Sequence, residues 1–315
     1  MLPDSRPEMN RTFDAAGLQV FERGWLSSNN VLFDGGDRRE SVLVDSGYST
    51  HAAQTTALVR KALGPRRLGR IVNTHLHSDH CGGNHTLQTA FGCAIDVPVG
   101  EADKVDRWDE AELTYQDTGQ QCPRFNRTGS IRDGELLQCG AWQWQAIAAP
   151  GHDPESIVLY QPELKVLISA DALWENGFGV VFPELEGLSA FDDVRGTLER
   201  LAKLPVQWII PGHGAPFQGL AAAIGRAQSR LDGFIADPAR HARHAAKVLI
   251  KFHLLEVQHV ALAGLLEWFE STRYAQLTHT AYFGSMPLRE WSVALVNELA
   301  ASRAISIQRG TISNM

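Results

Sequence analysis

The sequence predicts an α/β protein with a two-sheet core, helices outside the sheets and a helical appendage at the C-terminus. Short apolar runs of strand length alternate with stretches of helical spacing through the first two thirds of the chain. His or Asp residues follow four of these runs. Beyond Phe217 the spacing becomes helical. Strands that alternate with helices in this way typically form layered sheets covered by helices.

The first part of the chain predicts an arm, a meander and a helix. Residues 1–14 are polar with two prolines and are expected to form an arm. Residues 51–63 have helical spacing and stop before Pro65. A second helix is expected through residues 86–91. The runs expected to form an antiparallel meander, with a glycine-containing turn at 34–37, are 18–21, 30–33 and 41–44.

The second part predicts more strands after a long irregular segment. Residues 100–132 are polar and irregular, which is typical of an active-site wall or lid, or of a surface excursion with its own helix. A helix is expected over 191–203. The runs expected to form strands are 71–72, 135–137, 142–148, 156–160, 165–169 and 208–210.

Length and composition fit either one large domain with an appendage or two domains. The chain has 315 residues, 44% of them hydrophobic, and we expect one unit over residues 1–217 and a helical one over 218–315. Helices are expected at 220–235, 239–270 and 288–302. No apolar run approaches the roughly 20 residues that span a bilayer, and the N-terminus lacks an apolar signal core. A cytoplasmic protein with reduced cysteines is therefore expected.

The stretch from Gly69 to Gly83 concentrates the functional signal. It contains His75, His77, Asp79 and His80 directly after the short apolar run. Because alternate residues of an extended segment point the same way, the first two histidines can approach one metal from one side. Asp79 and His80 lie where the chain turns, so they can face a second ion. Imidazole and carboxylate are donors that zinc and iron favour.

Three further donors follow apolar runs later in the chain. They are His152 in Pro-Gly-His-Asp, Asp171 in Ser-Ala-Asp-Ala and His213 in Pro-Gly-His-Gly. With the earlier cluster they predict a metal site. The C-terminal histidines, by contrast, lack an accompanying carboxylate or cysteine and are expected in the core or at the surface: His241, His244, His253 and His259.

The combined motifs resemble the metallo-β-lactamase superfamily, in its glyoxalase II-like hydrolase branch. The resemblance covers residues 15–217 and implies an αβ/βα four-layer sandwich. A winged-helix-like unit is implied for residues 239–309. Asp45, at the end of the third strand, is expected beneath the metal loop. The implied metal ligands are His75, His77 and His152 for one ion, Asp79, His80 and His213 for the other, and Asp171 as the bridge.

The resemblance implies a hydrolase that uses a hydroxide shared by two divalent ions. Zinc is the first expectation, with iron or manganese as alternatives, and Asp79 and Asp171 are the expected catalytic carboxylates. Candidate substrates are an ester, thioester, lactone or phosphoester. Trp174, Phe178 and Phe182 follow the bridging aspartate and suggest an apolar or aromatic acyl group, with core packing as the alternative.

Other functions and partners stay open at this point. The alternatives are a metal-dependent phosphodiesterase or ribonuclease, a sulfur dioxygenase with one iron, and a binding protein with a vestigial site. The tail is only mildly basic, so nucleic acid is not expected as the partner. A small-molecule substrate and no membrane contact are expected. The apolar helix at 248–269 could pack within the tail or form a homodimer.

Overall fold

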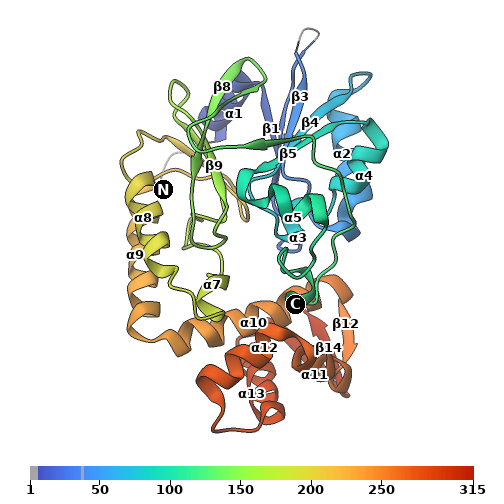
Figure 1. Ribbon diagram of the computed structural model, residues 1–315, viewed down its shortest axis with the longest axis vertical. Helices are drawn as coiled ribbons and strands as arrows, with labels where there is room; N and C mark the ends of the chain where they lie inside the picture. Colours follow the sequence, from blue (N-terminus) through green and yellow to red (C-terminus); the bar gives the residue numbers. More distant parts are fainter. Residues whose placement is uncertain (1–5, 37–38) are drawn as a thin grey trace.

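The computed structural model describes residues 6–36 and 39–315 and shows two β-sheets packed face to face, with helices on their outer sides (Figure 1). The first sheet has six strands in the order of the chain. They are β1 (Leu18–Phe21), β2 (Asn30–Phe33), β3 (Ser41–Val44), β4 (Leu68–Val72), β5 (Ala94–Pro98) and β6 (Gly129–Ile131). The first three pair antiparallel, as expected, and β3 to β6 pair parallel. The predicted turn at 34–37 ends on Asp37, which lies outside the described residues.

The second sheet has five strands in the reverse order, β11-β10-β9-β8-β7. The strands are β7 (Leu136–Cys139), β8 (Trp142–Ala148), β9 (Ile157–Gln161), β10 (Val166–Ala170) and β11 (Trp208–Pro211). Strands β7 to β10 pair antiparallel, and β10 pairs parallel with β11. Strands β8, β10 and β11 therefore run in the same direction, and their carboxyl ends meet at one edge of the sheet.

Strand residues alternate between two cores because both faces of each sheet are covered. Val42 and Val44 of β3 pack between the sheets, whereas Leu43 packs outward. In β9, Leu159 faces the other sheet and Val158 faces the outer helices. This alternation produces four layers from a sequence that reads as nearly continuous apolar runs.

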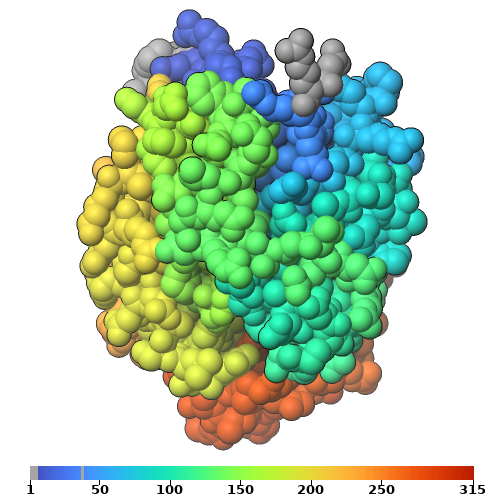
Figure 2. Space-filling model, turned by 45° about the horizontal axis from the view of Figure 1, so that its top comes forward, coloured from blue at the N-terminus to red at the C-terminus, as the bar shows by residue number. Residues whose placement is uncertain are grey.

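The outer layers consist of two helix pairs. On the first sheet lie α2 (Ala52–Leu63) and α4 (Asn84–Phe91), and on the second lie α8 (Phe191–Leu201) and α9 (Leu220–Ala236). Figure 2 shows the two halves side by side, with the orange-red C-terminal part below them.

The N-terminal arm prediction is wrong for the described residues. Residues 1–5 lie outside the described range, but Arg6–Ala16 forms helix α1. Its Phe13 and Ala16 are buried, and the Phe13 ring lies 6.1 Å from that of Trp208 between the sheets. Pro7 is tolerated because it lies in the first helical turn, where the backbone N–H has no partner to lose.

The irregular segment 100–132 packs against the first sheet and forms its own short helices, α5 (Ala102–Arg107) and α6 (Tyr115–Thr118). Tyr115 and Phe125 are buried against the outer face of the first sheet. Asp117 forms an ion pair with Arg273 of the C-terminal part, with a nitrogen–oxygen distance of 2.6 Å. Of the two alternatives, the structure shows the excursion with its own helices.

The C-terminal part combines helices with a small antiparallel sheet in the order β12-β14-β13. Its elements are α10 (Pro238–Val257), β12 (His259–Ala261), α11 (Leu262–Ser271), α12 (Arg273–Thr278), α13 (Leu288–Ala301), β13 (Ile305–Gln308) and β14 (Thr311–Asn314). The single helix predicted over 239–270 is therefore wrong: Gln258 has a φ of 63°, which ends α10 before β12. The apolar faces of α10 and α11 pack within this part, in one core.

Helix α9 packs with the second sheet and α8 rather than with the C-terminal core. The division at residues 217 and 218 stays a prediction, and this packing favours a boundary near Asp237, between α9 and α10. Among the described residues, no helix combines the length and apolar character needed to cross a membrane.

The C-terminal histidines occupy ordinary positions. His241 accepts a hydrogen bond from the backbone N–H of Val181 at 3.2 Å, and the His253 ring stacks on Trp268. His244 Nε2 accepts from the guanidinium of Arg230 at 2.6 Å. Burial and the charge of Arg230 lower the pKa of His244 to about 3.

This depressed pKa predicts a pH-dependent stability. The unfolded chain binds a proton to His244 below about pH 6.5, whereas the folded chain does not until about pH 3. The contribution of neutral His244 to the free energy of unfolding is therefore complete above pH 6.5. It is lost as the pH falls from about 6.5 towards about 3. We expect His244→Gln to reduce the difference in Tm between pH 7.5 and pH 5.0, because Gln keeps an acceptor for Arg230 without titrating. Equal pH dependence of the two proteins would contradict this assignment.

Candidate metal centre

The predicted donors converge from the ends of four strands. His75 and His77 follow β4, and Asp79 and His80 lie on the short helix α3 (Ser78–Cys81). The other three follow β8, β10 and β11, whose carboxyl ends share an edge: His152, Asp171 and His213. Within the described chain, the ligand atoms fall into two groups, each with all atoms within 4.8 Å of one another.

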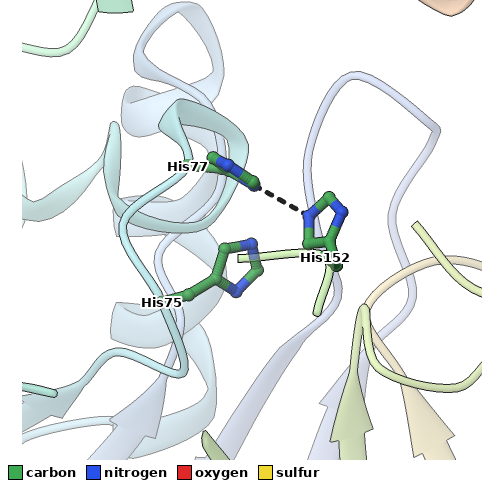
Figure 3. Close-up of side chains that lie close together, drawn as sticks. All are labelled: His75, His77 and His152. Carbon is green, nitrogen blue, oxygen red and sulfur yellow. Dashed lines mark hydrogen bonds between the residues drawn. The ribbon is translucent and has the colours of Figure 1, made fainter. Parts of the chain in front are cut away.

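The first group consists of His75, His77 and His152, whose rings point toward a common centre from both halves of the fold (Figure 3). The Nδ1 atom of His77 lies 2.8 Å from Nε2 of His152. Burial, with the nearby imidazoles, lowers the pKa of His77 and His152 to about 4. His75 is fully buried, and its pKa is lowered well below the usual value for the same reasons. The three imidazoles are therefore neutral at pH 7, as metal ligation requires.

The second group consists of Asp79, His80, Asp171 and His213. Asp79 Oδ2 lies 3.0 Å from His213 Nε2, and His80 Nε2 lies 3.5 Å from Asp171 Oδ1. Burial alone would raise the pKa of both aspartates. The neighbouring histidines outweigh burial and lower both, so the carboxylates stay ionised.

Asp171 lies between the two groups. Its Oδ1 atom faces His80, and its Oδ2 atom lies 3.5 Å from His152 Nε2 of the first group and 3.8 Å from His213 Nε2 of the second. The residue before it, Ala170, has a φ of 45°, a left-handed conformation that costs about 1 kcal/mol or more for alanine. The backbone is thus held in an unfavourable conformation where the carboxylate is placed.

The donor set fits metal ions because two buried nitrogens lack a protein partner. Nε2 of His75 and Nε2 of His80 are buried without a hydrogen bond. An unsatisfied buried polar atom is costly. His152 Nδ1 instead lies 2.5 Å from the carbonyl of Val180, so that nitrogen donates and Nε2 faces His77 Nδ1 in the first group.

Asp45 supports the second group from below. Its Oδ1 accepts from the Thr74 backbone N–H at 2.8 Å, while Oδ2 lies 2.8 Å from the Thr74 hydroxyl and 2.7 Å from His80 Nδ1. This bond makes Nδ1 of His80 the donor and leaves Nε2 facing the other ligands. The φ of Asp45 is 57°, a conformation that Asp and Asn tolerate.

Replacing Asp45 with Asn is expected to weaken metal binding while preserving the fold. The amide must place a donor against either the Thr74 N–H or the His80 N–H, so at least one bond is lost. Loss of such a support typically lowers metal affinity by about 10- to 100-fold. Chelator competition measures the affinity, and Asp232→Asn, at an exposed ion pair with Arg195, is the control. Unchanged affinity would show that Asp45 does not orient His80.

The structure places two of the predicted aromatic residues beside the donors. Trp174 donates its Nε1–H to Asp171 Oδ1 at 3.1 Å, and its ring lies 5.5 Å from that of His213. The Phe182 ring lies 5.1 Å from that of His77. Both rings are half-buried.

Phe178 does not lie at the mouth of the site. It is 1% exposed and packs with the second sheet and α9. Its ring lies edge-on to Phe234, and the guanidinium of Arg230 lies 5.6 Å from its centroid. Its predicted place near the substrate is therefore corrected to core packing, since the chain turns at Gly177, where φ is 135°.

One residue at the site escaped sequence reasoning. Trp25 lies in the loop 22–29 between β1 and β2, and its ring stacks on His213 at 5.2 Å with an interplanar angle of 5°. No periodicity marks it, and only the presence of a tryptophan in a short loop could have signalled it.

Cys81, next to His80, does not face the donors. It lies 3.7 Å from the Cys122 sulfur, and burial raises the pKa of its thiol.

Comparisons with known proteins agree with this geometry. A profile described as the metallo-beta-lactamase superfamily matches residues 23–213. A beta-lactamase domain protein from Burkholderia ambifaria covers 94% of this chain and 91% of its own, with a TM-score of 0.58 and 19% identity. A metallo-beta-lactamase family protein from Thermus thermophilus covers 95% and 99%, with a TM-score of 0.53 and 21% identity. These structures show a shared fold.

Curated relatives carry the name hydroxyacylglutathione hydrolase. The protein from Bdellovibrio bacteriovorus is 30% identical over 143 residues, which are 45% of this chain and 47% of the relative. The one from Methylococcus capsulatus is 29% identical over 171 residues, 53% and 57% of the two chains. This chain thus spans about half the length of the curated relatives it matches. The expected fold is confirmed, and the chain belongs to the metallo-β-lactamase superfamily, where it is similar to the glyoxalase II-like hydrolases.

Proposed function

We propose that the protein is a metal-dependent hydrolase that cleaves an ester, thioester or lactone of a small, partly apolar molecule. The observation that carries this proposal is the position of Asp171 between two groups of donors. Similarity to hydroxyacylglutathione hydrolases over about half of the chain supports a thioester.

We assign the metal ligands by group. His75, His77 and His152 would hold one divalent ion, Asp79, His80 and His213 the other, and Asp171 both. Zinc fits the imidazole and carboxylate donors, as do iron and manganese. When bound, such a pair supplies a nucleophilic water near neutral pH and polarises the substrate carbonyl.

The protein's own residues orient these ligands. Asp45 and the Val180 carbonyl set the tautomers of His80 and His152, and Trp174 holds one oxygen of Asp171. Asp79 is ionised beside His213, so it would accept the proton released by the attacking water and deliver it to the departing alkoxide or thiolate. No serine or cysteine nucleophile is needed in this scheme.

The alternatives find less support in the structure. A dioxygenase whose single iron is held by two His and one Asp would leave Asp79, His80 and His213 without a use. A nuclease would need free basic side chains in the tail, but several are already paired there. Arg243 and Lys247 both contact Glu298, and Arg289 contacts Glu270.

The test is a hydrolysis panel of a thioester, an ester, a lactone, a phosphodiester and a β-lactam. We expect turnover in the first three classes, loss of turnover after chelation, and recovery when zinc is added back. Cleavage of the phosphodiester alone, or turnover that survives removal of the metal, would overturn the proposal.

A further inference from the structure

Two tryptophans form an aromatic surface beside the second group of donors. Trp25 is 56% exposed and lies edge-on to Trp174, with ring centroids 5.4 Å apart. Trp25 also stacks parallel on the ring of His213. We call Trp25 and Trp174 the tryptophan pair. Each member contacts a predicted ligand: Trp25 stacks on His213, and Trp174 donates a hydrogen bond to Asp171.

The loop that carries Trp25 is fixed to the ligand loops. The Ser28 backbone N–H donates to the Asp79 carbonyl at 2.9 Å. The Asn29 backbone N–H donates to the Gly212 carbonyl at 2.7 Å, and its side-chain amide donates to the Gly214 carbonyl at 2.7 Å. These bonds reach both sides of His213. Trp25 is therefore held in register with the metal centre rather than on a free surface loop.

The exposure of the Trp25 ring differs from that of an ordinary apolar residue at the surface. Single apolar residues are common on protein surfaces. Trp25, however, belongs to a pair, is fixed in place, and covers a donor with one face while more than half of its side chain stays open to solvent. A pre-positioned aromatic face next to a reaction centre binds a flat apolar group at little entropic cost.

The first group of donors has an aromatic neighbour of a different kind. Phe182 lies beside His77 and also contacts Tyr274 of the C-terminal part, with ring centroids 5.2 Å apart. Tyr274 is 1% exposed and bonds to Glu186 at 2.7 Å. Phe182 is therefore packed between the first group of donors and the C-terminal part, whereas the tryptophan pair has a face open to solvent.

We propose that the tryptophan pair binds a planar aromatic group of the substrate, attached next to the scissile carbonyl. This inference rests on the proposed hydrolase function and narrows its substrate class to aromatic esters or thioesters. A flat ring can stack on the open face of Trp25, whereas a small aliphatic acyl group is too short to cover it. Trp25 is thus a specificity-determining residue.

Kinetics with matched substrates test the selectivity. Two thioesters of one thiol, with acetyl and phenylacetyl groups, and two acetyl esters, with methyl and benzyl leaving groups, place the ring on either side of the carbonyl. We expect the wild type to prefer the aromatic member of at least one couple. The selectivity is the kcat/KM of the aromatic substrate divided by that of its aliphatic counterpart. Trp25→Ala should lower this ratio by about tenfold, and Trp25→Phe should retain most of it. Leu136→Ala, with a side chain 58% exposed in β7, is the control and should leave the ratio unchanged.

A binding measurement tests the same inference without turnover. Phenylacetate and acetate are titrated into the protein while tryptophan emission is followed. We expect phenylacetate to change the emission of the wild type at lower concentration than acetate, and this difference to disappear in Trp25→Ala.

The outcomes separate the two proposals. Absence of hydrolysis with preserved phenylacetate binding would overturn the proposed function and keep the aromatic site. Hydrolysis with no aromatic preference, unaffected by Trp25→Ala, would overturn the aromatic site and keep the hydrolase. Emission that changes on protein dilution but not with phenylacetate would show that a second copy covers Trp25, and would also overturn the inference.

Discussion

Asp171→Ala is expected to remove most of the bound metal and to lower hydrolysis by at least about a hundredfold. The carboxylate is the donor that faces both groups, with oxygens 3.5 Å from His80 Nε2 and 3.5 Å from His152 Nε2. Without it, five imidazoles would face two cations with Asp79 as the remaining carboxylate. Elemental analysis measures the bound metal, and the rate of hydrolysis of the preferred substrate of the panel measures the activity.

Two companion variants sharpen this test. Asp171→Asn keeps the shape and the contact with Trp174 but removes the charge, so it should lose metal as well. Asp232→Asn removes a carboxylate from an exposed ion pair and should change neither quantity. Full turnover of Asp171→Ala with one ion remaining would contradict a centre that requires the shared aspartate.

Gly212→Ala is expected to disrupt the centre almost as strongly, although glycine carries no ligand atom. A Cβ atom at this position would lie 2.0 Å from Asp171 Oδ1 and 3.1 Å from the Ala170 carbonyl carbon. The backbone cannot easily withdraw, because Gly212 donates to the Ala170 carbonyl at 2.8 Å and accepts from Asn29 at 2.7 Å. The Asp171 carboxylate must therefore move, at a cost of about 1–3 kcal/mol in stability and with loss of bound metal.

Gly225→Ala is the matched control for this substitution. Gly225 lies inside α9, and apart from its own turn of helix nothing described lies within 4 Å of an added Cβ. Alanine is favoured over glycine within a helix by about 1 kcal/mol, so this variant should bind metal normally and melt at an equal or higher temperature. Normal metal content in Gly212→Ala would show that Asp171 can move without disturbing the centre.

The sequence predicted the parts of the fold that depend on apolar runs of strand length. The strand runs at 18–21, 30–33, 41–44 and 142–148 coincide with β1, β2, β3 and β8. The donors could be predicted because each follows such a run, and carboxyl ends of neighbouring strands meet at one edge. The structure adds the supports that connect them, such as the Val180 carbonyl, which no side-chain pattern could reveal.

Other features depend on contacts distant in sequence. Helix α1 forms where an arm was expected because Phe13 finds a place between the sheets against Trp208. Phe178 and Phe182 look equivalent in sequence, yet one enters the core and the other contacts His77. Trp25 gains its significance from a stack on His213, almost two hundred positions away along the chain.

The most direct test of the central claim is elemental analysis of the full chain purified without added metal, beside the hydrolysis panel. The account predicts about two divalent ions per chain, with zinc first, and turnover of an ester, thioester or lactone that disappears with the metal. One iron per chain without hydrolysis would contradict it, because the second group of donors would then have no ion to hold.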